Sequence, residues 1–202
     1  KLEDKLLIHN FGHGGSGMSL SWGTASMATD LALPHGERKA AVLGSGVVGL
    51  TTARELQRHG FDVTIYAATV PPDTTSNMSL AGWTPTSGLV DNQLRTAAWD
   101  AQVRQAARIA YRRLQLLIGP KYGVTWVTQY QPTDDDQPPR PQENPILAAE
   151  FSGPRVVLGP GEHPFGTKFA IQREEMRIEP SIYLDALMKD VLDWGGKVVI
   201  RK

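Results

Sequence analysis

One stretch decides the fold: Ala40-Ala41-Val42-Leu43-Gly44-Ser45-Gly46-Val47-Val48-Gly49. Its four leading apolar residues predict a strand of a parallel sheet that is covered on both faces. The glycines that follow form a G-x-G-x-x-G turn into a helix. Gly44 permits the tight turn, Gly46 lets a pyrophosphate approach the backbone, and Gly49 lets the helix pack close to the strand. The stretch therefore predicts a dinucleotide site at the start of that helix.

The residues that follow complete a βαβ unit. We expect the helix to run to His59, with Gly60 ending it, and Asp62 to Ala67 to form the next strand. The acidic residue that usually holds the ribose about 20 positions on is missing, because this strand leads into Ala68-Thr69. Its absence weakens a NAD site, and the lack of an Arg there disfavours NADP. A ribose held by backbone groups or by Thr69 stays open.

The remaining chain continues the alternation of helices and strands. Residues 68–93 and 131–145 are rich in turn-forming residues and predict loops. Helices are expected at 18–33, 95–118 and 181–194, and strands at 6–8, 124–130, 156–158, 169–178 and 197–200.

The composition of the 202 residues excludes several classes of protein. The chain carries 21 basic and 21 acidic side chains, which argues against nucleic-acid binding, and it has no Cys, which excludes disulfides and thiol chemistry. The apolar stretch Ala40 to Ala53 is too short and too rich in glycine to span a bilayer, so we expect no membrane partner. The charged start is unlike a signal peptide, and the missing initiator Met indicates a trimmed start, so the compartment stays open.

A second glycine-rich block, Gly12-His13-Gly14-Gly15-Ser16-Gly17-Met18-Ser19, opens the helix at 18–33. Met18 stands where a triphosphate loop needs Lys, which argues against a triphosphate hydrolase. His9 and His13 lie in a loop without a third ligand, so we expect no metal site. Two helix starts without side chains suggest a ligand with two electron-rich ends, and a flavin dinucleotide has them in its pyrophosphate and its pyrimidine edge.

Three blocks, residues 8–23, 42–50 and 74–85, together resemble the D-amino acid oxidase family of FAD enzymes. The resemblance implies an α/β fold: a Rossmann-like FAD-binding domain with a parallel sheet, plus part of a mixed or antiparallel substrate domain.

The resemblance also implies which residues bind the cofactor. The pyrophosphate would lie on Gly44, Ser45, Gly46, Val47, Val48 and Gly49. Phosphate and ribityl oxygens would be bound by Thr74, Thr75 and Ser76. The flavin ring would lie along Ala81, Gly82, Trp83 and Thr84. The pyrimidine edge and the ribityl chain would be reached by Gly14, Gly15, Ser16, Gly17, Met18 and Ser19. Trp83 could instead be an ordinary core aromatic.

The resemblance also implies an unusual chain order. In the family the glycine–histidine block follows the substrate domain, so its place before the first strand indicates a circular permutation. We expect an FAD-binding domain at 1–120, partial substrate-domain strands at 121–180, and a return to the FAD domain at 181–202. The family's substrate-carboxylate Arg and active-site Tyr belong to a half that would follow Lys202. We therefore nominate no catalytic residue.

The hypothesis that follows is an FAD-dependent amino-acid oxidase. It would convert an amino acid, by resemblance a D-amino acid, and O₂ into a keto acid, ammonia and hydrogen peroxide. One alternative is a flavin-binding subunit or fragment that is inactive without a second chain or a missing C-terminal half carrying the substrate pocket. The other is a nicotinamide-dependent reductase. A homo-oligomer stays open.

Overall fold

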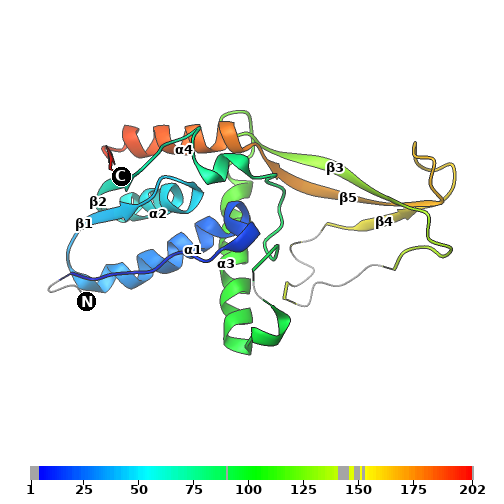
Figure 1. The fold of residues 1–202 in the computed structure, drawn as a ribbon, viewed down its shortest axis with the longest axis horizontal. Coiled ribbons are helices and arrows are strands. Elements are labelled where there is room, and N and C mark those ends of the chain that lie inside the picture. The colour runs from blue at the N-terminus through cyan, green and yellow to red at the C-terminus, as the bar shows by residue number, and fades with distance from the viewer. Residues whose placement is uncertain (1–4, 90, 141–145, 148–150, 152, 202) are drawn as a thin grey trace.

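The computed structural model describes residues 5–89, 91–140, 146–147, 151 and 153–201 (Figure 1). In this part of the chain, three strands form a parallel sheet in the order β1-β2-β6. Their bounds are Lys39–Leu43 for β1, Asp62–Ala67 for β2 and Lys197–Ile200 for β6. The predicted βαβ unit is confirmed, because β1 and β2 pair in parallel and helix α2, Val47–Arg58, connects them.

The apolar side chains of α2 explain why it packs on the sheet. Leu50 and Ala53 are fully buried, as are Val63 and Ile65 on β2, and all four belong to one hydrophobic cluster. Burial of this kind contributes about 25 cal/mol per Å² of apolar surface removed from water. Helix α4, Pro180–Asp193, packs against α2 and leads into β6. The chain therefore returns to the parallel sheet at β6, which pairs with β2.

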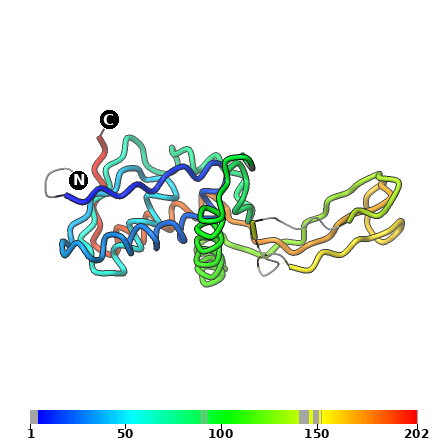
Figure 2. Tube along the Cα trace, turned by 90° about the horizontal axis from the view of Figure 1, so that it is seen from below, coloured from blue at the N-terminus to red at the C-terminus, as the bar shows by residue number. Residues whose placement is uncertain are grey.

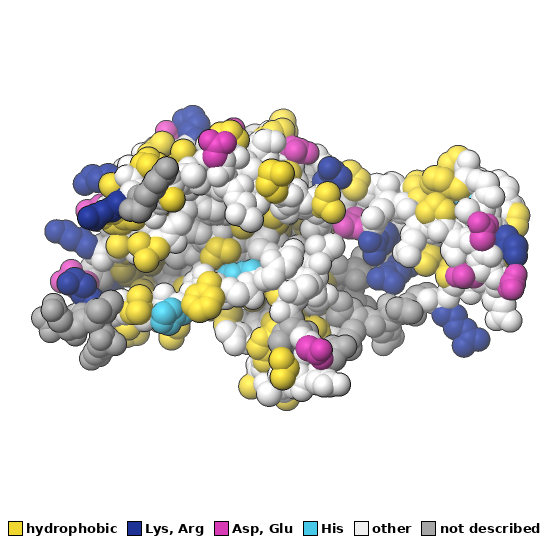
Figure 3. Space-filling view, viewed as in Figure 1, with side chains coloured by type: hydrophobic (Ala, Val, Ile, Leu, Met, Phe, Trp, Pro, Cys, Tyr) yellow, Lys and Arg dark blue, Asp and Glu magenta, His cyan; other side chains and the backbone are white. Residues whose placement is uncertain are grey.

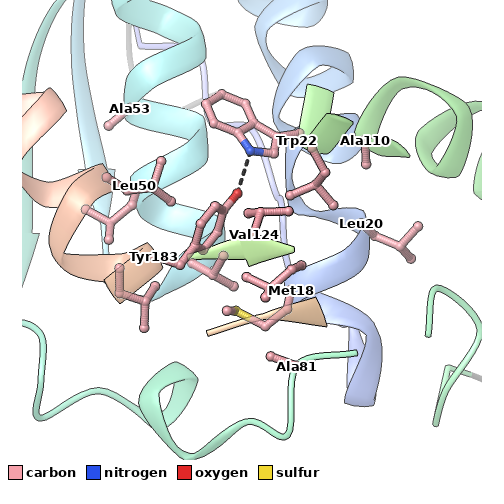
Figure 4. Packing of buried hydrophobic residues seen from close by; sticks show 14 of the residues in the cluster. Met18, Leu20, Trp22, Leu50, Ala53, Ala81, Ala110, Val124 and Tyr183 are labelled. Atoms are coloured by element: carbon pink, nitrogen blue, oxygen red, sulfur yellow. Dashed lines mark hydrogen bonds between the residues drawn. The ribbon is translucent and has the colours of Figure 1, made fainter. Parts of the chain in front are cut away.

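Two further helices, α1 (Gly17–Ala32) and α3 (Ala97–Gln115), pack against each other beside α2. A Cβ built on Gly23 would collide with the backbone of Ala106, so the two helices approach more closely than any side chain would allow. On α1, the Trp22 indole Nε1 donates a 2.6 Å hydrogen bond to the Tyr183 hydroxyl on α4, and the pair lies at the centre of the core (Figure 4). Burial raises the pKa of Tyr183, so its phenol stays neutral.

The second sheet is antiparallel and extends away from the helices as an arm (Figures 1 and 2). Its strands are β3 (Val124–Thr133), β4 (Arg155–Leu158) and β5 (Phe169–Ile178), in the order β3-β5-β4. On β5 near the helices, Met176 and Ile178 are buried, whereas Glu175 and Arg177 lie on the opposite face. The fold is thus the expected mixture of a parallel and an antiparallel sheet.

Two expectations about local structure were wrong. Residues 6–13 form no strand, and Leu6 and Leu7 are 40% and 50% exposed, so this apolar run is not buried in a sheet. The parallel sheet is covered on one face rather than two. Val42 is buried under the helices, but its neighbour Leu43 is 80% exposed on the other face.

Most predicted bounds lie within one or two residues of the observed ones. The exceptions are α3, which ends at Gln115 rather than Ile118, and β3, which extends to Thr133 into the predicted loop. Part of that loop, residues 141–145, lies outside the described residues. No helix in the described ranges combines the length and the apolar character needed to cross a membrane.

Candidate functional site

Two helix starts lie side by side at one end of the parallel sheet. A Cβ built on Gly17, at the start of α1, would lie 3.6 Å from Val47 Cγ1, at the start of α2. A short 3-10 turn, Gly14–Ser16, leads into α1. Neither α1 nor α2 has a side-chain N-cap hydrogen bond or an acidic residue in its first turn. At the start of α2 the Val47 N–H already donates to Ser76 Oγ, but both starts still present the positive end of a helix dipole to an anionic or electron-rich ligand.

The turn before α2 has the geometry that its glycines predict. Gly44 has φ +98°, a conformation that residues with a Cβ rarely adopt. A Cβ on Gly49 would collide with the carbonyl oxygen of Gly44, so this glycine is what lets the helix pack on the strand. A Cβ on Gly46 would lie 2.8 Å from Ser76 Oγ, which accepts a 3.0 Å hydrogen bond from the Val47 N–H. Ser76 thus lies directly over the start of α2.

The hydroxyls of Ser16 and Ser19 hold a loop rather than face a ligand. Ser16 Oγ lies 3.0 Å from the carbonyl oxygen of Thr84 and 2.8 Å from that of Ser87, and it donates to them. Ser19 Oγ accepts a 2.9 Å hydrogen bond from the Thr84 N–H and lies 3.3 Å from the carbonyl oxygen of Gly82. This use of Ser16 explains why its hydroxyl does not cap α1. The loop at 82–87 is fixed to the first turns of that helix.

The same loop is fixed on its other side to β5. The Trp83 N–H donates to the Met176 carbonyl at 2.9 Å, and the Ile178 N–H donates to the Ala81 carbonyl at 2.8 Å. Gly82 and Arg177 form an antiparallel bridge between these bonds. The loop therefore connects the helix starts to the arm formed by the antiparallel sheet.

These elements line an open cavity of about 1030 Å³. Ten of the residues that the resemblance implies as cofactor-binding line it: Gly14, Gly15, Gly17, Met18, Val47, Thr75, Ser76, Ala81, Gly82 and Thr84. Both helix starts thus open into one space, which suits a ligand with two electron-rich ends.

The other residues implied by the resemblance lie outside this lining. They are Ser16, Ser19, Gly44, Ser45, Gly46, Val48, Gly49, Thr74 and Trp83. Several have a different partner: Ser45 Oγ donates to the Thr69 carbonyl at 2.5 Å, and Thr74 Oγ1 donates to Asn77 Oδ1 at 2.7 Å. These bonds shape the loops that follow β2 rather than the wall of the cavity.

Trp83 occupies a different environment from its neighbours. It is 9% exposed and packs on Tyr111 and Phe151, with ring centroids 5.0 Å and 6.5 Å away. It lines a second, small pocket of about 60 Å³. This placement favours the core-aromatic interpretation of Trp83.

One wall of the cavity was not predicted from the sequence. The antiparallel sheet supplies five of its residues, which are Val127, Thr128, Gln129, Glu175 and Arg177. No motif marks them. The only signal is the alternation of β5, where polar residues separate the buried Met176 and Ile178. Alternation alone does not say which ligand the polar face meets.

The charged and titratable groups near the cavity are few. Glu175 forms an ion pair with Arg173 at 2.8 Å. Burial lowers the pKa of His13, whose Nε2 lies 2.8 Å from Thr24 Oγ1. Within the described ranges, no three His, Asp or Glu side chains gather closely enough to hold a metal ion.

A family model described as FAD dependent oxidoreductase (DAO) matches residues 39–202. No curated protein matches the chain. The match begins at β1, so the glycine-rich residues 12–19 and helix α1 precede the matched region. Gly14, Gly15, Gly17 and Met18 nevertheless line the same cavity.

Solved structures share the fold at low sequence identity. Iminodiacetate oxidase from Chelativorans sp. BNC1 superposes with a TM-score of 0.54 at 17% identity, covering 80% of this chain and 46% of that one. Glycine oxidase from Bacillus cereus ATCC 14579 gives 0.52 at 12% identity with the same coverage. L-Amino acid deaminase from Proteus myxofaciens gives 0.51 at 14% identity, covering 80% and 37%. The chain spans less than half the length of each of these proteins. Its phosphate turn, its two-sheet fold and the family match agree, and the chain belongs to the DAO family of FAD-dependent oxidoreductases.

Proposed function

We propose that this chain holds FAD in the 1030 Å³ cavity and takes part in the oxidation of an amino acid. The observation that carries the proposal is that two helix starts, at Gly17 and Val47, line that one cavity. When bound, the flavin supplies the redox chemistry by accepting a hydride from the substrate α-carbon. The chain's own groups would bind and orient the flavin and stabilise its negative charge.

At the start of α2 the chain would hold the pyrophosphate. Gly46 has no side chain, so the phosphates can reach the N–H groups of the first turn. Ser76 Oγ, 3.0 Å from the Val47 nitrogen, and the neighbouring Thr75 border the same part of the cavity. These hydroxyls would donate hydrogen bonds to phosphate or ribityl oxygens.

At the start of α1 the chain would stabilise the electron-rich pyrimidine edge of the ring. Gly14, Gly15, Gly17 and Met18 line the cavity here, and no capping side chain competes for their N–H groups. A helix dipole favours negative charge at this end, and the stabilisation increases when the bound ring is reduced. The loop at Ala81, Gly82 and Thr84 would then lie along the ring.

The proposed overall reaction is oxidative deamination. The amino acid loses two electrons and two protons, water hydrolyses the resulting imine to a keto acid and ammonia, and O₂ is reduced to hydrogen peroxide. The resemblance to D-amino acid oxidases favours a D-amino acid. Handedness needs a direct test, because one of the solved structures that share the fold is named an L-amino acid deaminase.

We also propose that the chain is circularly permuted relative to the family, with residues 12–19 and helix α1 placed before β1. The support is spatial: residues before the family match and residues within it line the same cavity. A crystal structure with FAD should place the pyrimidine edge of the ring at Gly17. A ring that is turned away from Gly17 would contradict the permutation.

A second candidate function is a flavin-binding chain whose activity depends on a second polypeptide or on further sequence. The favouring observation is that the chain matches only 46% or less of the length of the solved oxidases and deaminase. The mass of the intact native material, with any co-purifying chain, and assays with and without that partner separate the two candidates.

The direct test is flavin uptake followed by reduction. The purified protein should be yellow and should release FAD on denaturation. Its flavin should bleach anaerobically with one enantiomer of an amino acid, and peroxide should form when oxygen is admitted. A colourless protein that ignores added FAD would refute the proposal, and tight NADH binding without flavin would favour a nicotinamide reductase instead.

A further inference from the structure

A row of charged residues lies on the cavity side of β5, next to the loop that would hold the flavin ring. Arg173, Glu175 and Arg177 are alternate residues of β5, so their side chains share one face of the strand. Glu175 Oε1 lies 2.5 Å from where a Cβ on Gly82 would be, so this carboxylate rests against the loop. Figure 3 shows basic side chains exposed where the helical part of the molecule meets the arm.

The charges in this row do not cancel. Arg173 neutralises Glu175 through the 2.8 Å ion pair, and its Nε also donates to Gln129 Oε1 at 2.7 Å. Arg177 is exposed, lines the 1030 Å³ cavity, and forms no ion pair with any residue that the structure describes. The cavity wall therefore presents one uncompensated guanidinium.

The surroundings of Arg177 are polar. Of the five residues that the antiparallel sheet contributes to the cavity, only Val127 is apolar. The apolar part of the cavity lining, which includes Met18, Met78 and Leu80, lies on other elements. A guanidinium presents N–H groups in a planar fork that matches a carboxylate with two parallel hydrogen bonds.

We propose that Arg177 is a specificity-determining residue that binds the side-chain carboxylate of an acidic amino-acid substrate, such as aspartate or glutamate. The proposal rests on the proposed function, since it places the substrate between the flavin loop and β5. It extends that function by naming the substrate class. It predicts that ligands with two carboxylates bind more tightly than ligands with one.

The test uses calorimetric titration of the purified protein, with its flavin content recorded, at constant ionic strength. The probes are glutarate, with two carboxylates, and butyrate, with one. We expect glutarate to bind about tenfold more tightly than butyrate, as one charge-assisted pair would give. Arg177→Gln should remove this difference, and Arg177→Lys should retain part of it.

A matched control is Arg112→Gln, which removes an Arg from an exposed position on α3 outside the cavity lining. It should leave the tenfold preference unchanged, and thermal unfolding should show that all variants are folded. Arg173→Gln is a second probe. Glu175 then loses its ion-pair partner and competes with the ligand carboxylate for Arg177, so the preference for glutarate over butyrate should fall.

Three outcomes would overturn the proposal. One is equal binding of both probes by the unaltered protein, and another is an equal loss of both in Arg177→Gln. The third is weakened FAD binding in Arg177→Gln with the glutarate preference intact. Because calorimetry needs no turnover, a protein that prefers glutarate but oxidises no amino acid would refute the proposed oxidase activity and leave the role of Arg177 standing.

Discussion

Gly46 shows how much one missing side chain can decide. Its backbone is extended, with φ −71° and ψ −178°, so the conformation itself does not require glycine. The requirement comes from space, because a Cβ would lie 2.8 Å from Ser76 Oγ. Because Gly46 has no Cβ, it also leaves room for a phosphate to approach the start of α2.

We therefore predict that Gly46→Ala impairs cofactor binding more than folding. The added methyl group displaces Ser76 and occupies the approach of the phosphates, so FAD affinity should fall by at least about tenfold, or about 1.4 kcal/mol. Fluorescence titration with FAD measures it. Gly166→Ala is the control, since a Cβ there meets nothing within 4 Å. Unchanged affinity in Gly46→Ala would contradict the assigned phosphate position.

Trp22 and Tyr183 form a buried pair in which each polar group depends on the other. Tyr183→Phe leaves the Trp22 N–H without its 2.6 Å acceptor in the core. An unsatisfied buried donor costs about 1–3 kcal/mol, so the free energy of unfolding should fall by that amount. Urea denaturation measures the change. Tyr130→Phe, at an exposed position on β3, should leave the midpoint nearly unchanged.

At the scale of elements, the contact between α1 and α3 is set by backbone rather than side chains. Gly23 lets α1 approach Ala106 so closely that a methyl group would overlap the α3 backbone. This contact helps to fix α1, whose start borders the cavity and whose Ser16 and Ser19 hold the loop at 82–87. Packing far from the ligand thus positions groups near it.

Gly23→Ala should accordingly destabilise the protein although Ala favours helices. The intrinsic gain of about 1 kcal/mol is outweighed when the helices must separate, and overpacking of this kind typically costs about 1–3 kcal/mol. Thermal unfolding measures the net effect. Ser26→Ala on the same helix serves as the control, as Ser26 is only partly buried. A rise in stability for Gly23→Ala would show that α3 can move away freely.

For the whole molecule, the cavity couples the helical part to the arm. Its lining comes from both helix starts, the loop after β2, and strands β3 and β5. A ligand bound there contacts the native arrangement and cannot bind the unfolded chain in the same way. Ligand binding is therefore expected to stabilise the fold as a unit.

Thermal unfolding with added FAD checks this coupling. At a free concentration one hundred times the dissociation constant, FAD should add about 2.7 kcal/mol to the free energy of unfolding. The midpoint should rise steadily with FAD concentration. Adenosine monophosphate at the same molar concentration should raise the midpoint less, because it reaches only one helix start. No shift with FAD would argue against the cavity as its site.

Many parts of this fold could be predicted because they depend on neighbours in sequence. Residue types at fixed spacing predict the strand–glycine turn–helix at 40–59, and its bounds agree closely with β1 and α2. The amphipathic helix predicted at 181–194 lies one residue from the bounds of α4, and the strand predicted at 169–178 matches β5. The positions of Trp83 and Arg177 could not be found in this way, since both depend on how the loop after β2 meets β5.

The sequence by itself determined the helices, the strands and the two glycine turns, because hydrophobic periodicity and glycine's backbone freedom act over a few residues. Only the tertiary structure decided that the starts of α1 and α2 meet at one cavity, that Trp83 packs on Tyr111, and that Arg177 faces the cavity wall. These outcomes depend on contacts between residues far apart in the chain. Such contacts are set by the packing and strand register of the whole fold, which no local pattern specifies.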